Sequence, residues 1–126
     1  MKPVVYDAGV LVAADRNVRR VWAEHRVRLE AGVLPLVPAP VVAQVSRSAR
    51  QAQLRRFLVG CEVVALDESG AHASGVLLGE ARAKDVVDAS VVHLAVLRHA
   101  DIVTSDVEDI RKLVAAAGKA IGVLEA

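Results

Sequence analysis

Residues 3–14 read PVVYDAGVLVAA, an apolar run that is interrupted at its centre by Asp7-Ala8-Gly9. The first part, up to Tyr6, is short and β-branched, which is typical of a strand, and the apolar run resumes directly after the interruption. We therefore predict a strand, a turn and a helix in this segment, with Asp7 at the carboxyl end of the strand.

The same alternation continues along the rest of the chain. Further strand-like runs lie at residues 33–38, 61–66, 102–104 and 121–124. Helical patterns lie at residues 18–29, 40–49, 47–58, 69–83, 86–97 and 107–117. Such alternation predicts an α/β fold with a central, mainly parallel sheet and helices on both faces. We expect a three-layer α/β/α arrangement with four to five strands, in a single domain spanning residues 1–126.

Composition restricts the class of protein. Hydrophobic residues make up 54% of the chain, and the formal net charge of +1 is that of neither a polycation nor an acidic tail. The lone Cys61 cannot form an internal disulfide, and no apolar stretch approaches the roughly 20 residues that a bilayer-spanning helix requires. We expect a cytoplasmic protein without a membrane partner.

His25 lies on the apolar stripe of the helix predicted at 18–29, which indicates a packing residue.

Five aspartates, each at the end of an apolar run or the start of a helix, form the most informative pattern: Asp7, Asp85, Asp88, Asp106 and Asp109. Each has a structural interpretation, because aspartate is common in turns, at helix N-caps and in the first helical turn. In an alternating α/β protein, however, such positions converge on the carboxyl edge of the sheet. Asp88 lies in an otherwise apolar helix, and burial of its carboxylate is costly unless a cation compensates it. A metal ion shared with Asp7 and Asp106 would do so.

Four segments of the chain resemble one known family. They read VVYD at 4–7, VPAPVVAQV at 37–45, DVVDA at 85–89 and VTSDVEDI at 103–110. The chain is similar along nearly its whole length to the PIN-domain ribonucleases, and specifically to the toxin component of VapBC-type toxin–antitoxin pairs. The resemblance implies a PIN-like fold and an acidic quartet that holds one or two Mg²⁺ or Mn²⁺ ions.

The acidic positions of that family carry over only in part. Asp7, Asp88 and Asp106 match three of them, and they are the expected metal ligands and catalytic residues. The fourth position is usually glutamate, and here it is Gln44, which can coordinate through its carbonyl but brings no charge. Either a neighbouring acid substitutes for it, with Asp85 and Asp109 as the candidates, or metal affinity and rate are lower.

The residues after the first acid also differ from the family pattern. A hydroxyl residue commonly follows the first aspartate, but here Ala8-Gly9 stands at that place. Thr104 and Ser105 do retain hydroxyls beside Asp106. The chemistry itself is general, since hydrolysis of a phosphodiester needs charge neutralisation and a hydroxide, both of which a carboxylate-bound Mg²⁺ supplies.

The resemblance also implies partners. It implies an RNA substrate, a small antitoxin whose C-terminal segment covers the acidic groove, and a homodimer. Four arginines follow the middle segment, and they either contact RNA or antitoxin or form a solvated helix face: Arg47, Arg50, Arg55 and Arg56. The alternative function is a catalytically weak or inactive PIN-like module that binds an antitoxin or nucleic acid without cleaving it, which Gln44 favours.

Overall fold

A parallel sheet of five strands forms the centre of the computed structural model, which describes all residues from 1 to 126. The strands are β1 (Val4–Tyr6), β2 (Pro35–Pro38), β3 (Glu62–Val64), β4 (Asp101–Thr104) and β5 (Val123–Glu125). Their order across the sheet is β3-β2-β1-β4-β5, and every neighbouring pair is parallel. The short apolar β1 is therefore at the centre, as its near-complete burial requires.

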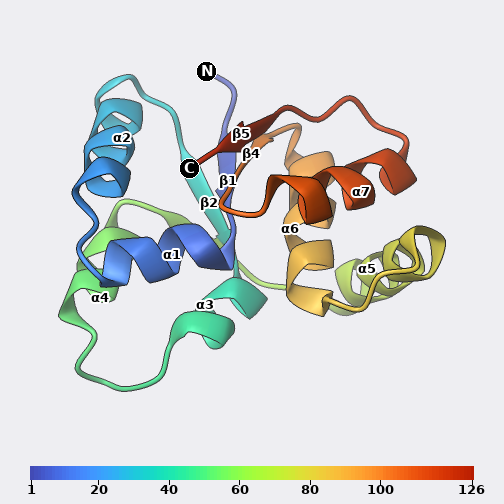
Figure 1. Ribbon diagram of the computed structural model, residues 1–126, viewed down its shortest axis with the longest axis horizontal. Helices are drawn as coiled ribbons and strands as arrows, with labels where there is room; N and C mark the ends of the chain where they lie inside the picture. Colours follow the sequence, from blue (N-terminus) through green and yellow to red (C-terminus); the bar gives the residue numbers. More distant parts are fainter.

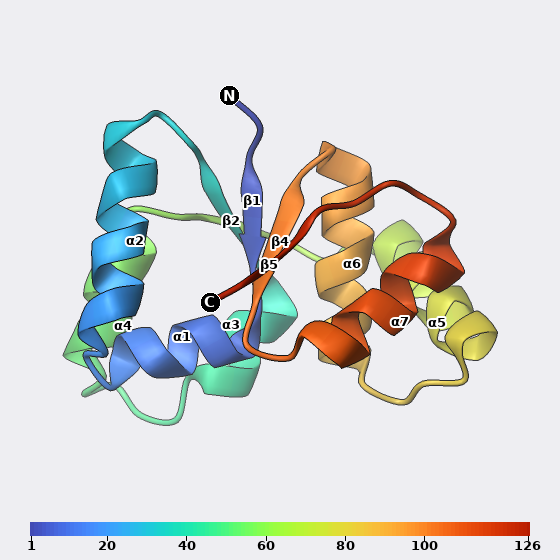
Figure 2. The same ribbon diagram turned by 45° about the horizontal axis from the view of Figure 1, so that its top comes forward.

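Seven helices connect the strands. They are α1 (Ala8–Asp15), α2 (Arg19–Glu30), α3 (Ala39–Val45), α4 (Ala52–Val59), α5 (Glu68–Ala81), α6 (Val86–Arg98) and α7 (Val107–Ala117). In Figure 2, α1, α2 and α4 lie on one side of the sheet, and α5, α6 and α7 lie on the other. The predicted three-layer α/β/α class is thus confirmed. None of the helices has the length and apolar content that crossing a membrane requires.

The core lies on both faces of β1 and is mainly aliphatic. Its largest fully buried side chains include Tyr6, Leu11, Phe57 and Ile102. Burial of each such side chain contributes about 1.5–3 kcal/mol relative to exposure. The Tyr6 hydroxyl lies 2.9 Å from Nδ1 of His25, which is buried against Phe57. Burial lowers the pKa of His25 to about 4, so His25 is a neutral packing residue, as predicted.

Local sequence signals explain several helix ends. Asp7 and Asp85 cap α1 and α6 by accepting hydrogen bonds from the backbone amides of Val10 and Asp88. Gly118 ends α7 in the left-handed conformation that glycine adopts without strain. Two predictions are wrong in extent: the helix expected at residues 40–49 ends at Val45, and the basic helix expected at residues 47–58 begins only at Ala52. Residues 46–51 form a loop instead, because local hydrogen bonds to the Gln51 side chain satisfy its backbone amides.

Strand register determines which side chains meet at the carboxyl edge of the sheet. Tyr6 of β1 pairs with Val103 of β4, and the amide of Asp7 donates to the carbonyl of Val103 over 3.2 Å. Asp7 therefore lies beside Thr104, and the turn that leads into α7 begins there. The N-terminal ends of α1, α6 and α7 all open onto this edge (Figure 1).

Candidate metal centre

Asp7 is the buried carboxylate of this edge, with only 3% of the residue exposed. Its Oδ1 accepts the Val10 amide over 3.1 Å, and its Oδ2 accepts a short hydrogen bond from the Thr104 hydroxyl. Burial raises the pKa of Asp7, and these hydrogen bonds oppose the rise because they favour the charged form. Asp7 is thus anchored by the protein through both of its carboxylate oxygens.

Thr104 links Asp7 to the next acid. Its hydroxyl donates to Asp7 and accepts the amide of Asp106 over 2.8 Å. Asp106 stands at the N-cap of α7, yet its side chain makes no capping hydrogen bond. The capping interpretation is therefore wrong for Asp106, whose carboxylate faces Asp88 and Asp109 instead.

Asp85 and Asp88 have different roles: Asp85 caps a helix, and Asp88 belongs to the acidic site. Asp85 is exposed and caps α6, since its Oδ1 accepts the Asp88 amide over 3.0 Å. Asp88 follows in the first turn of α6 and is half-buried. Asp88 is thus partly shielded from solvent at the start of an otherwise apolar helix, whereas Asp7, which follows the central strand, is the fully buried acid of this edge.

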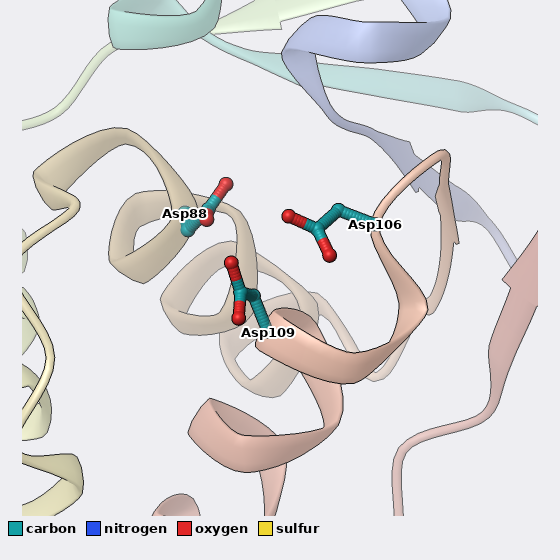
Figure 3. Close-up of side chains that lie close together, drawn as sticks. All are labelled: Asp88, Asp106 and Asp109. Atoms are coloured by element: carbon teal, nitrogen blue, oxygen red, sulfur yellow. The ribbon is translucent and has the colours of Figure 1, made fainter.

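Three carboxylates converge at this edge. One oxygen each of Asp88, Asp106 and Asp109 lies within 4.8 Å of the others, and Figure 3 shows the three side chains turned toward a common point. Asp109 reaches the group from the first turn of α7, one turn after Asp106. The converging set therefore contains Asp109, one of the two acids suggested as a substitute for the missing glutamate.

The electrostatics of the group reflect this crowding. Burial and then the negative charges of Asp85, Asp7, Asp106 and Asp109 raise the pKa of Asp88 to about 7. A hydrogen bond and repulsion from Asp106 likewise raise the pKa of Asp109, and Lys112 opposes this rise. No lysine, arginine or histidine lies within ion-pair distance of any of the five aspartates. The group therefore carries negative charge without a direct cationic partner.

This donor set fits a hard divalent cation. Carboxylate oxygens are the ligands that Mg²⁺ and Mn²⁺ prefer, and an ion bound by two or three carboxylates retains open positions for water and substrate. Asp106 and Asp109 are exposed, so the group can be reached from solvent. The repulsion that raises the pKa of Asp88 is the kind of energy that a bound cation relieves.

The structure explains why a glycine, Gly9, stands two residues after the first aspartate. A Cβ atom built on Gly9 would lie 1.7 Å from Oγ and 2.8 Å from Cβ of Ser105. The same Cβ position is 3.5 Å from Oδ1 of Asp7. Ser105 therefore occupies the space that a side chain at position 9 would need, and it brings its own hydroxyl close to the first acid.

Gln44 and the arginines make no hydrogen bond or ion pair with the converging acids. Gln44 is exposed on α3, and no hydrogen bond joins its side chain to the aspartates. The Arg56 guanidinium lies over the Trp22 ring, 5.0 Å from its centroid, and so faces α2. Arg47 and Arg50 lie in the loop between α3 and α4, and Arg55 lies in the first turn of α4. Arg56 thus faces α2, and the other three arginines lie in or beside the loop.

Comparisons with known proteins identify the fold. No protein-family model and no curated protein matches the sequence. A chain in the crystal structure of VapBC2 from Rickettsia felis, bound to a DNA fragment from their promoter, superposes with a TM-score of 0.76 at 15% identity over 98% of both chains. The crystal structure of PAE2754 from Pyrobaculum aerophilum superposes with a TM-score of 0.63 at 18% identity, over 94% of this chain and 98% of that one. The resemblance seen in the sequence is thus confirmed at the level of the fold, which is PIN-like.

Proposed function

We propose that this protein is a Mg²⁺- or Mn²⁺-dependent ribonuclease that acts as the toxin of a toxin–antitoxin pair. The observation that carries the proposal is the convergence of Asp88, Asp106 and Asp109 without a cationic partner at the carboxyl edge of a PIN-like fold. These three residues would hold the ion, and the buried Asp7 adds a fourth negative charge close by.

The chemistry required is hydrolysis of an RNA phosphodiester. When bound, a divalent ion neutralises charge on the phosphate and lowers the pKa of water toward neutrality. The protein contributes orientation: Thr104 holds Asp7 and the Asp106 backbone in a fixed relation, and the half-buried Asp88 accepts a proton near neutral pH. Because Asp106 and Asp109 are exposed, a nucleic-acid backbone can approach them directly.

The structural likeness supports the biological assignment. One of the similar chains belongs to VapBC2, and we infer that this protein likewise binds a small antitoxin. In keeping with the sequence resemblance, we expect it to act in the cytoplasm as a homodimer. Asp85 has a supporting role in this proposal, because it caps α6 and so fixes the start of the helix that carries Asp88.

One observation favours a second function. Gln44 stands where the resembled family usually has glutamate, and an uncharged residue there lowers the negative charge available to an ion. A PIN-like module with too weak a metal site would bind antitoxin or nucleic acid without cleaving it. The position of Asp109 beside Asp88 and Asp106 supports the nuclease, because together with Asp7 it brings the number of neighbouring acids to four.

Cleavage of total RNA by purified protein tests the proposal. We expect cleavage with Mg²⁺ or Mn²⁺, none with EDTA, and its loss in Asp88→Asn. Glu80→Gln, which neutralises an exposed acid on α5 away from the edge, is the matched control and should cleave like the wild type. If the folded wild type fails to cleave with either metal, the nuclease proposal is wrong, and Gln44→Glu then tests the binding module.

A further inference from the structure

Charge is distributed unequally between the two halves of the chain. Residues 1–60 contain ten lysines or arginines and four acids, whereas residues 61–126 contain six and eleven. The first half builds the layer with α1, α2 and α4, and the second half builds the layer with α5, α6 and α7 (Figure 2). The near-zero net charge of the whole chain therefore conceals a basic layer and an acidic layer on opposite sides of the sheet.

The loop between α3 and α4 carries part of the basic charge and is held by a single side chain. Oε1 of Gln51 accepts the amides of Arg47 and Ser48 over 2.6 and 3.0 Å. Its Nε2 donates to the Val45 carbonyl and to Oδ2 of Asp15, both over 3.0 Å. The bond to Asp15 ties the loop to the end of α1, so the loop has a defined conformation without belonging to a helix or strand.

Arg47 and Arg50 lie in this loop and Arg55 follows it in α4, and we call residues 46–51 together with Arg55 the arginine loop. Arg47 donates to the carbonyls of Ala43 and Ser46 over 3.2 and 3.1 Å. Arg55 donates to the Ala49 carbonyl over 3.3 Å, and the Arg50 side chain has no hydrogen-bond partner. None of the three arginines forms an ion pair, and all are exposed.

This arrangement is suited to an anionic chain. Each guanidinium has five N–H donors, so those of Arg47 and Arg55 are oriented by the loop backbone and still have donors to spare. Orientation before binding reduces the entropy that binding costs. The loop follows the end of α3 and is tied to the end of α1. In Figure 2 it lies on the same side of the molecule as the starts of α1, α6 and α7, which carry the acids.

The occupant that fits best is a phosphate backbone. None of the large exposed hydrophobic residues lies between residues 43 and 58, whereas protein interfaces depend on aromatic and apolar anchors. Charge alone is sufficient for a nucleic-acid backbone. The chain has only three aromatic residues, so stacking on bases contributes little to binding.

We propose that the arginine loop holds the phosphate backbone of single-stranded RNA beside the carboxylate group, with Gln51 as the positioning residue of the loop. This inference rests on the proposed ribonuclease function and adds to it the side from which the RNA reaches the acids. The RNA lies along the basic layer and does not follow the acidic layer of α5, α6 and α7.

Binding of oligouridylate tests the inference separately from cleavage. Affinity is measured by fluorescence anisotropy over a range of salt concentrations, in EDTA and in an Asp88→Asn background that does not cut the probe. We expect Arg50→Ala to weaken binding about fivefold and to reduce the slope of log affinity against log salt by about 0.7. Lys119→Ala is the matched control, because it removes one exposed cation at the opposite edge of the sheet, where Lys119 lies beside Lys2 and His99.

Gln51→Ala separates positioning from charge. It removes no charge, and we expect it to weaken RNA binding and to speed amide exchange in residues 46–51, with the unfolding midpoint little changed. Unchanged RNA affinity in this variant despite faster exchange would show that Gln51 does not position the loop for RNA.

Three other results would overturn the inference. One is a slope of log affinity against log salt that is the same in Arg50→Ala as in the parent protein. A loss of RNA affinity in Lys119→Ala as large as that in Arg50→Ala would likewise overturn it, because it would indicate unspecific attraction. The third is competition by poly-glutamate as strong as that by oligouridylate of equal charge, which would assign the loop to an acidic protein. If wild-type protein cleaves RNA but Arg50→Ala binds normally, only this inference fails; if wild type does not cleave while Arg50 governs binding, only the nuclease proposal fails.

Discussion

Replacement of Asp88 by asparagine should stabilise the metal-free protein at alkaline pH. The folded-state pKa of Asp88 is about 7 and its ordinary value is 3.8, chiefly because of burial and then because of the four neighbouring acids. The folded protein therefore binds this proton more tightly than the unfolded chain does. The charged carboxylate opposes folding above pH 7, and the penalty shrinks as the pH falls below 7 and vanishes near pH 4.

The size of the effect follows from the same shift. A difference of about three pKa units corresponds to about 4 kcal/mol as an upper limit for a fully buried group. Because Asp88 is only half-buried, solvent screening reduces this limit to about 2 kcal/mol. The carboxylate also interacts favourably with the start of α6, which takes away about 0.5 kcal/mol. We expect a net gain of about 1–1.5 kcal/mol for Asp88→Asn, or roughly 3–6 °C in the unfolding midpoint.

Thermal unfolding in EDTA between pH 4 and pH 8 measures the effect. Asp88→Asn should exceed the wild type in midpoint at pH 8 and should equal it near pH 4. The buried groups Asp7 and His25 titrate in both proteins, so the difference between the variants at each pH isolates Asp88. Glu80→Gln should show no such pH-dependent difference. A lower midpoint for Asp88→Asn at pH 8 would refute the account of repulsion within the acidic group.

Three further predictions concern the same edge. Mg²⁺ or Mn²⁺ should raise the unfolding midpoint of the wild type more at pH 8 than at pH 6, because protons compete with the ion for the carboxylates; equal shifts in differential scanning fluorimetry would contradict this. Thr104→Val should destabilise the protein by about 1–3 kcal/mol in urea titrations, because the buried Asp7 loses a donor and the Asp106 amide loses its acceptor, whereas Thr104→Ser should retain most of the stability. Gly9→Ala should also lower stability, since its Cβ would lie 1.7 Å from Oγ of Ser105, and Ser105→Gly in the same chain should restore it. No recovery in the double variant would mean that the close approach is not the cause.

Several features of the site could be predicted from local sequence because their causes are local. Aspartate before a helix accepts backbone amides that have no partner within the helix, which is why Asp85 could be anticipated as a cap. The apolar runs and their interruptions similarly predicted the order of strands and helices. The position of acids at the carboxyl ends of parallel strands then follows from the topology of any such sheet.

Other features depended on contacts between distant residues. The Thr104 hydroxyl occupies one oxygen of Asp7 because β1 and β4 pair in one register, and no local pattern encodes that register. Asp109 joins Asp88 because α7 begins beside the start of α6. The arginines between α3 and α4 lie on a loop because Gln51 reaches across to Asp15.

The sequence by itself determined the α/β class, the succession of elements and the set of acids available at one edge, because periodicity and helix capping act over a few residues. Only the tertiary structure decided which carboxylates remain free and which are engaged by hydrogen bonds. The physical reason is that a side-chain oxygen binds whichever donor the packing of remote elements brings within about 3 Å, and that choice is made only once the sheet has formed.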